Sequence, residues 1–165
     1  MMQHFIMGLA LAMAFASTVS GADKAARSGP PSTPAAAISA RETGSMKIRI
    51  TVEDKVMTAT LLDNKTAQDF VSLLPLTLSM NDLFGREKYA HLPRVLSDEG
   101  KRTRTYEVGD IVYWSPGPDV AIYYRHDGQA IPAPGIIVIG KIDSRVEALD
   151  VPGSLRVTVE LVGRP

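Results

Sequence analysis

Short segments in which apolar and polar residues alternate recur along this 165-residue chain from residue 46 onward. Positions 48, 50 and 52 are Ile, Ile and Val with polar neighbours, and residues 155–161 repeat the pattern. An alternation with a period of two is typical of a half-buried β-strand. Gly- and Pro-containing turns separate about eight such segments, which predicts a mainly β fold. We expect residues 46–52 and 155–161 to pair and to close a β-barrel.

Two short helices interrupt the predicted strands. Thr66 and Asp69 have the spacing of a capping box, and the apolar residues 67, 70, 71 and 74 follow at helical spacing. Pro75 ends this helix because its ring cannot continue the hydrogen-bond ladder. Residues 143–149 predict a second short helix, stopped by the Pro and Gly at 152–153. The expected fold class is a closed β-barrel of about eight strands with two short helices.

Residues 1–22 have the layout of a signal peptide. An apolar run over 5–16 leads to Ser20, Gly21 and Ala22, which are small residues before a predicted cut at Asp23. The run is too short to span a membrane comfortably, although it lacks a preceding Lys or Arg, and an uncleaved anchor or a buried helix is the alternative. We therefore expect a periplasmic or secreted protein with no stable membrane anchor after cleavage.

Residues 23–45 are rich in Ala, Pro, Ser and Gly and contain almost nothing large enough to bury. Such a segment cannot offset its ordering entropy, so we interpret it as a disordered linker. Residues 46–162 remain, which is an ordinary size for one domain with a single core.

Composition argues against several classes of function. The formal net charge is zero, with 18 basic and 18 acidic residues, whereas a nucleic-acid binder normally has a basic excess. The chain has no cysteine, hence no disulfide, thiol nucleophile or Cys-based metal site. His91 and His126 stand in no metal-ligand spacing, and no P-loop, dinucleotide fingerprint or nucleophile elbow is present. We expect no metal, no cofactor and no nucleic-acid partner.

Several short motifs, taken in their order and spacing, resemble the bacterial cyclophilin-like family. They cover essentially all of residues 46–162 and comprise NKTAQDF at 64–70, LLPL at 73–76, EKY at 87–89, LP at 92–93, GD at 109–110 and GKI at 140–142. The resemblance implies a cyclophilin-type barrel with helices closing its ends. It does not by itself imply an activity, because one fold hosts many functions.

The resemblance also raises peptidyl-prolyl isomerisation, the reaction of true cyclophilins. That reaction needs an apolar pocket and a donor aimed at the prolyl nitrogen, which weakens the amide resonance behind a barrier of about 18–20 kcal/mol. The arginine, followed closely by Phe and Gln, that true cyclophilins use is not found here. Arg86, Arg94 and Arg125 are the arginines considered for the donor. The aromatic residues considered for the pocket are Phe84, Tyr89, Trp114, Tyr123 and Tyr124.

Candidate binding residues come from two regions. One is the strand expected to end at Met80 and the loop after it, which contains Tyr89 and Arg94. The other is the strand that contains Tyr123 and Arg125, which would share a face, where an aromatic ring and a cation could bind a peptide or carboxylate. The alternative is a strand end with one core tyrosine and one solvated arginine. Trp114, the sole tryptophan, is more often a packing residue. The predicted ligand-binding residues are Met80, Tyr89, Arg94, Tyr123 and Arg125.

Three functions therefore remain open. The first is a binding module for a small molecule or peptide without established catalysis. The second is a divergent peptidyl-prolyl cis–trans isomerase, and the third is an interaction protein that pairs an exposed strand edge with a partner. A deep pocket with an arginine over an apolar floor would favour the enzyme, and a pocket without that cation would favour simple binding. A filled barrel with a flat exposed edge would favour the interaction protein.

Overall fold

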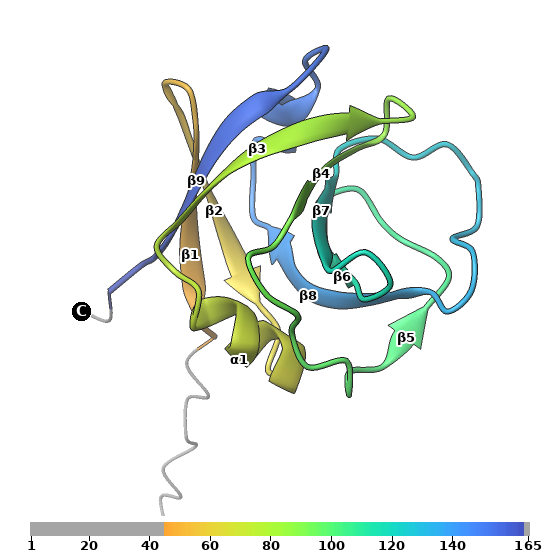
Figure 1. Cartoon of the computed structure of the whole chain (residues 1–165). Helices are drawn as coiled ribbons and strands as arrows, with labels where there is room; N and C mark the ends of the chain where they lie inside the picture. Colours follow the sequence, from red (N-terminus) through yellow and green to blue (C-terminus); the bar gives the residue numbers. More distant parts are fainter. Residues whose placement is uncertain (1–44, 164–165) are drawn as a thin grey trace, which may run out of the picture. The chain divides into compact units, whose positions relative to one another are not determined.

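The strands of the computed structural model, which describes residues 45–163, form one antiparallel sheet that closes on itself (Figure 1). Eight strands follow around the barrel in the order β2-β1-β9-β3-β4-β7-β6-β8, and β8 pairs back to β2. The ninth, β5, pairs with the first residues of β8. The prediction of a closed, mainly β barrel is confirmed. The strands are β1 (Lys47–Val52), β2 (Lys55–Leu61), β3 (Leu76–Leu83), β4 (Glu87–His91), β5 (Arg102–Thr103), β6 (Asp110–Trp114), β7 (Asp119–Tyr123), β8 (Ile136–Ile142) and β9 (Leu155–Leu161).

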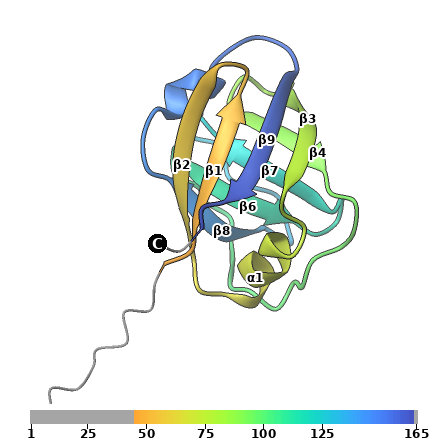
Figure 2. The same ribbon diagram turned by 90° about the vertical axis from the view of Figure 1, so that its left-hand side faces the viewer.

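The two ends of the domain close the barrel. β1 pairs with β9 over five residues, from Ile48 opposite Leu161 to Val52 opposite Val157, as predicted. Figure 2 shows β2, β1 and β9 side by side. The apolar residues of β1 and β9 other than Leu161 are buried inside the barrel, while the polar residues between them face outward. This arrangement follows from the period of two in the sequence, because successive side chains of a strand point to opposite faces.

Helix α1 (Lys65–Val71) lies at one end of the barrel (Figures 1 and 2) and buries Ala67 and Phe70. The predicted capping box is wrong: Asn64 is the N-cap, and its Oδ1 accepts a hydrogen bond from the Ala67 amide at 2.8 Å. Thr66 and Asp69 instead bind the backbone of Ser97, as donor and acceptor respectively. They attach the segment after β4 to the helix, a long-range role that local spacing does not reveal.

The second predicted helix is a single 3₁₀ turn, η1 (Val146–Leu149), which buries only Leu149. None of the helices in residues 45–163 is long and apolar enough to cross a membrane. The predicted signal peptide at 1–22 and almost all of the predicted linker at 23–45 lie outside the described residues.

We predict that Asn64→Ala lowers the free energy of unfolding by about 1–2 kcal/mol. The side chain caps α1 through Oδ1, and its Nδ2 donates to the Val138 carbonyl at 3.0 Å, so alanine removes both bonds. Urea denaturation measures the change. Asn81→Ala, on the exposed surface of β3, is the control, and a loss no larger than that of the control would contradict the capping role.

Candidate binding pocket

A pocket of about 260 Å³ lies on the outer face of the barrel wall formed by β4, β7 and β6. It is open to solvent, and most of its lining is apolar. The lining residues are Leu83, Phe84, Arg86, Glu87, Tyr89, Val112, Trp114, Asp119, Ala121, Tyr123, Ile131, Pro132 and Ile136. The barrel interior, by contrast, is tightly packed: a cavity among core residues such as Ile48, Phe70 and Met80 measures only about 10 Å³.

Strand register arranges the outward-facing residues of this wall in three rows. The middle row is apolar and comprises Tyr89, Ala121 and Val112, which lie opposite one another. On one side of it lie Glu87 and Tyr123, and on the other lie His91, Asp119 and Trp114. Rows on one face are two residues apart, about 7 Å, so the two polar ends of the pocket lie about 13 Å apart along the strands. The pocket therefore has an apolar floor with a polar group at each end.

A second apolar cluster covers part of this outer face. It consists of Tyr106, Val112, Ala121, Tyr123, Ile131 and Ile136, all of them buried. The Tyr106 ring stacks on the Tyr123 ring with 3.9 Å between centroids. Ile131 belongs to the long connection between β7 and β8, and its amide donates to the Arg104 carbonyl. The cluster thus fixes one wall of the pocket from loops that are distant in the sequence.

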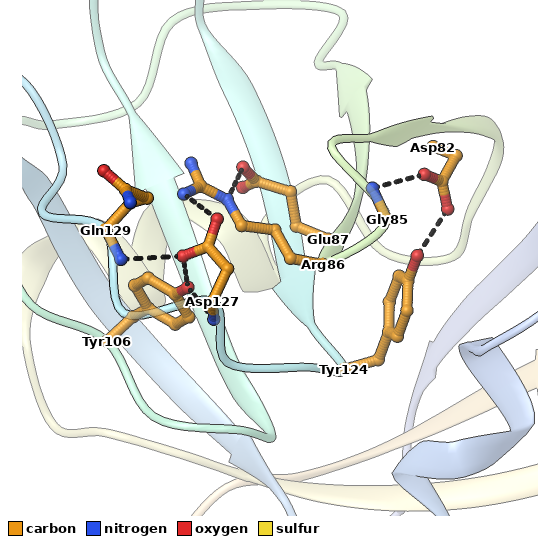
Figure 3. Close-up of polar contacts among 8 residues, drawn as sticks. All are labelled: Asp82, Gly85, Arg86, Glu87, Tyr106, Tyr124, Asp127 and Gln129. Atoms are coloured by element: carbon orange, nitrogen blue, oxygen red, sulfur yellow. Dashed lines mark hydrogen bonds and ion pairs between the residues drawn. The ribbon is translucent and has the colours of Figure 1, made fainter.

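Arg86 stands at the β4 end of the pocket and is almost fully buried. Its Nε donates to Glu87 Oε1 at 3.1 Å and its Nη1 to Asp127 Oδ2 at 3.0 Å (Figure 3). Its backbone carbonyl accepts from the amides of Tyr124 and Arg125, which fixes the main chain as well. The third nitrogen, Nη2, makes no hydrogen bond with another of residues 45–163 (Figure 3). Arg86 is therefore fixed by two carboxylates and retains one nitrogen whose N–H groups are free to donate.

Burial sets the ionisation of the neighbouring groups. It raises the pKa of the Glu87 carboxyl above its ordinary value, although the Tyr123 hydroxyl and the Arg86 guanidinium both oppose this shift. Burial also raises the pKa of the Tyr123 hydroxyl, and the adjacent Glu87 carboxylate adds to the effect. Tyr123 is therefore a neutral hydrogen-bond donor at physiological pH, and it can play no part as a phenolate.

Asp127 behaves in the opposite way. Hydrogen bonds from the Tyr106 hydroxyl and the Gln129 amide, together with Arg86, lower the pKa of its carboxyl to about 2. A lowered pKa in the folded state stabilises the fold above the unfolded value, and this contribution is lost as the pH falls through the folded value.

We therefore predict that Asp127→Asn flattens the pH dependence of the unfolding free energy between about pH 4 and pH 2. Urea denaturation across this range measures the slope, with Asp150→Asn on the exposed surface as the control. A variant that keeps the wild-type slope would contradict the assignment. Glu87 acts with the opposite sign and above its ordinary value of 4.5, so it does not obscure this window.

The turn between β3 and β4 carries the exposed rim of the pocket. The turn is short, because β3 continues to Leu83 and β4 begins at Glu87. Phe84 has a backbone φ of +58° and is 76% exposed to solvent. A bulky residue in the left-handed region is strained. The Asp82 carboxylate holds the turn by accepting from the Gly85 amide (Figure 3). The fold thus keeps a strained, solvent-facing phenyl ring beside Arg86, 5.2 Å from its guanidinium.

Asp119 forms the other polar end of the pocket. Its side chain is 15% exposed, and its Oδ1 lies against His91 Nδ1. The same Nδ1 lies 3.0 Å from the Gly117 carbonyl, so the Asp119 carboxylate shares this one nitrogen with a backbone oxygen. Burial raises the pKa of the Asp119 carboxyl, while His91 opposes the shift. Gly117 is required at the turn, since a Cβ there would approach Asp119 Oδ2 to 2.3 Å.

The predicted ligand-binding residues lie in four different places. Tyr89 and Tyr123 line the pocket. Met80 is buried inside the barrel. Arg94 donates to the Ser72 hydroxyl at 2.5 Å and to the Asp69 carbonyl near the end of α1. Arg125 is exposed and pairs with Asp150 at 2.6 Å. The structure therefore brings two of the five together, and the binding role of all five stays a prediction.

Glu87 and Asp119 were missed by sequence reasoning, and Arg86 was only one of three arginines considered. Charged residues near strand ends usually face solvent, so they carry no local signal of a pocket. One signal was present: in residues 87–91, Glu87, Tyr89 and His91 alternate with Lys88 and Ala90, as in a strand.

Residues 45–163 contain no group of three or more His, Cys, Asp or Glu side chains that could hold a metal ion.

Comparisons with known proteins agree with this architecture. The comparison with curated proteins gives no significant match. Among solved structures, the chain is similar to the solution structure of the hypothetical protein AF2241 from Archaeoglobus fulgidus, with 26% identity and a TM-score of 0.58. The match covers 72% of this chain and 95% of that one. The model of the Cyclophilin-like family matches residues 50–160, which is most of the barrel. The chain therefore belongs to the Cyclophilin-like family.

Proposed function

We propose that this protein is a binding module that holds a short peptide segment in the pocket on the outer face of β4, β7 and β6. One observation carries the proposal: the pocket has an apolar floor and a fixed arginine whose Nη2 has no partner among the described residues. Nη2 suits a backbone carbonyl, which is a hydrogen-bond acceptor in every peptide.

The size and lining of the pocket support a peptide segment. At about 260 Å³ it lies just below the ~300–1,000 Å³ typical of sites for drug-sized ligands, which suits one or two side chains. Aromatic residues are enriched in peptide and protein interfaces. Four line this pocket, namely Phe84, Tyr89, Trp114 and Tyr123. The third function considered, strand pairing with a partner, gains less support, because barrel closure leaves few free strand edges.

A titration of acetyl-Ala-Ala-Pro-Phe-amide, followed by the fluorescence of Trp114, tests the binding function. Trp114 is the sole tryptophan and lines the pocket, so it reports from the site itself. Ala121→Leu fills the floor and should weaken binding by at least about tenfold. Ser79→Leu, on the exposed face of β3, is the matched control. Equal affinity in both variants would place the peptide elsewhere and contradict the proposal.

A divergent peptidyl-prolyl isomerase is the second candidate, and one observation favours it. Arg86 stands beside an apolar floor with a free Nη2, which is the cation-and-pocket arrangement that the reaction requires. A donor aimed at the prolyl nitrogen would lower the barrier of about 18–20 kcal/mol by reducing amide resonance. The pocket thus contains the arginine that was expected to favour the enzyme. Its pairing with two carboxylates leaves Arg86 weaker as an electrophile than an unpaired arginine, which is why we place binding ahead of catalysis.

Exchange between the cis and trans forms of the same tetrapeptide, measured by NMR, separates the two candidates. Arg86→Lys retains a cation for Glu87 and Asp127 but lacks the third nitrogen, and Arg125→Lys is the control outside the pocket. Acceleration that Arg86→Lys abolishes and Arg125→Lys preserves would establish the isomerase. Binding without acceleration would leave the binding module alone.

Export to the periplasm or the medium is part of the proposal and is supported only by the sequence of residues 1–22. Sequencing the N-terminus of the protein recovered outside the cytoplasm tests it. A mature chain that begins at Asp23 is the expected result, and a chain that retains residues 1–22 would contradict cleavage.

A further inference from the structure

The pocket holds more negative than positive charge. Its lining contains the carboxylates of Glu87 and Asp119 and a single guanidinium, that of Arg86. Arg86 already pairs with Glu87 and also with Asp127, which lies beside the lining. Asp119 lies at the opposite end, about 13 Å away along the strands, too far to share this cation.

Asp119 has little to balance its charge. Its side chain is largely buried, and the polar contact of its Oδ1 among the described residues is with His91 Nδ1. Its ionic neighbour there is His91, whose side chain is 74% exposed, so solvent screens the pair. A cation supplied by a ligand would therefore meet a carboxylate whose charge the protein leaves largely unmatched.

Aromatic residues surround the same carboxylate. Trp114 lies directly opposite Asp119 across the β6–β7 pair, and Tyr89 lies one row away on β4. Both line the pocket. Directly opposite residues have their Cβ atoms about 4.5–5.5 Å apart, so the indole and the carboxylate border a common space. Aromatic faces attract ammonium and guanidinium groups, and tryptophan does so most strongly.

We propose that the Asp119 end of the pocket is a cation subsite, and that the bound peptide segment carries a lysine, an arginine or a free N-terminal ammonium beside its apolar residue. This inference rests on the proposed binding function and adds the polarity of the ligand. An apolar group lies on the floor at Ala121, the cation lies between Asp119 and Trp114, and an acceptor at the far end faces Arg86.

Three probes of similar size test the subsite on the full chain: phenethylammonium, 2-phenylethanol and 3-phenylpropanoate. They share a phenyl ring and differ in charge, and the fluorescence of Trp114 measures their dissociation constants. Phenethylammonium should bind about tenfold more tightly than the alcohol, because hydrogen bonds to charged groups contribute the most, and the carboxylate should bind most weakly.

Two charge-removing variants complete the test. Asp119→Asn should reduce the preference for the ammonium over the alcohol to less than twofold, while Asp150→Asn, an equal change on the exposed surface, should preserve it. The wild-type comparison of the three probes needs no variant, so the inference stays testable if Asp119→Asn fails to fold. If the three probes bind with equal affinity and Ala121→Leu abolishes their binding, the cation subsite is overturned while the binding pocket itself is supported. No effect of any probe or of the tetrapeptide on Trp114 would contradict both.

Discussion

Lys88→Met lowers the free energy of unfolding by about 3 kcal/mol, since it takes the donor away from two backbone carbonyls and from the partly exposed Asp82 carboxylate. Lys88 is 0% exposed, in the middle of β4 on the inner face of the barrel. Its Nζ donates to Asp82 Oδ2 at 2.8 Å and to the carbonyls of Val151 and Gly153 at 2.5 and 2.8 Å. Methionine preserves the volume but leaves all three acceptors without this donor.

Lys55→Met is the matched control, because Lys55 is exposed on β2 and its replacement should change stability by no more than about 0.5 kcal/mol. Urea denaturation gives both values. Hydrogen exchange should show that residues 146–154 open first in Lys88→Met, since Nζ ties the connection between η1 and β9 to the barrel. A stability equal to that of Lys55→Met would show that the buried lysine contributes nothing.

Arg86→Ala lowers the free energy of unfolding by about 3 kcal/mol, because it leaves Glu87 buried without its cation. It also removes the partner of Asp127 and the cation that lies 5.5 Å from the Tyr106 ring and 5.8 Å from the Tyr123 ring. These changes should disorder one wall of the pocket, so the tetrapeptide should bind at least about tenfold more weakly.

A double variant separates the charge from the packing. Arg86→Met combined with Glu87→Gln removes both charges and retains most of the volume, and we expect it to recover at least half of the stability lost in Arg86→Ala. Thermal unfolding and urea denaturation of the wild type, Arg86→Ala and the double variant measure how much stability is recovered. A double variant no more stable than Arg86→Ala would contradict the view that an unpaired Glu87 is the main cost.

The barrel could be predicted from sequence because the alternation of apolar and polar residues that marks each strand is a local pattern. Alternation in residues 46–52 and 155–161 reflects the two faces of each strand, and those strands pair as expected. The helix cap could not be assigned, because Thr66 and Asp69 fit a capping box but bind Ser97, which lies about 30 residues away. Local spacing cannot tell such a tertiary role from a cap.

The pocket was less accessible to sequence reasoning. Tyr123 was predicted as a binding residue because it would share a strand face with Arg125, and Tyr89 because it was expected in a loop beside Arg94; both line the pocket. Met80 and Arg94 have the right chemistry, but one points into the barrel and the other binds the end of α1. Whether a strand residue faces the core or the outer wall depends on register with its neighbours. Arg86, Glu87 and Asp119 become a site only once β4, β7 and β6 are aligned.

The proposed function requires the ligand to lie on the outer face of β4, β7 and β6. The most direct measurement is a heteronuclear NMR titration of the ¹⁵N-labelled chain with acetyl-Ala-Ala-Pro-Phe-amide. We predict the largest shifts at the amides of Tyr89, Val112, Trp114, Ala121 and Tyr123 and at the indole N–H of Trp114. Shifts concentrated instead on β1, β2 and β9, with these amides unchanged, would contradict the claim.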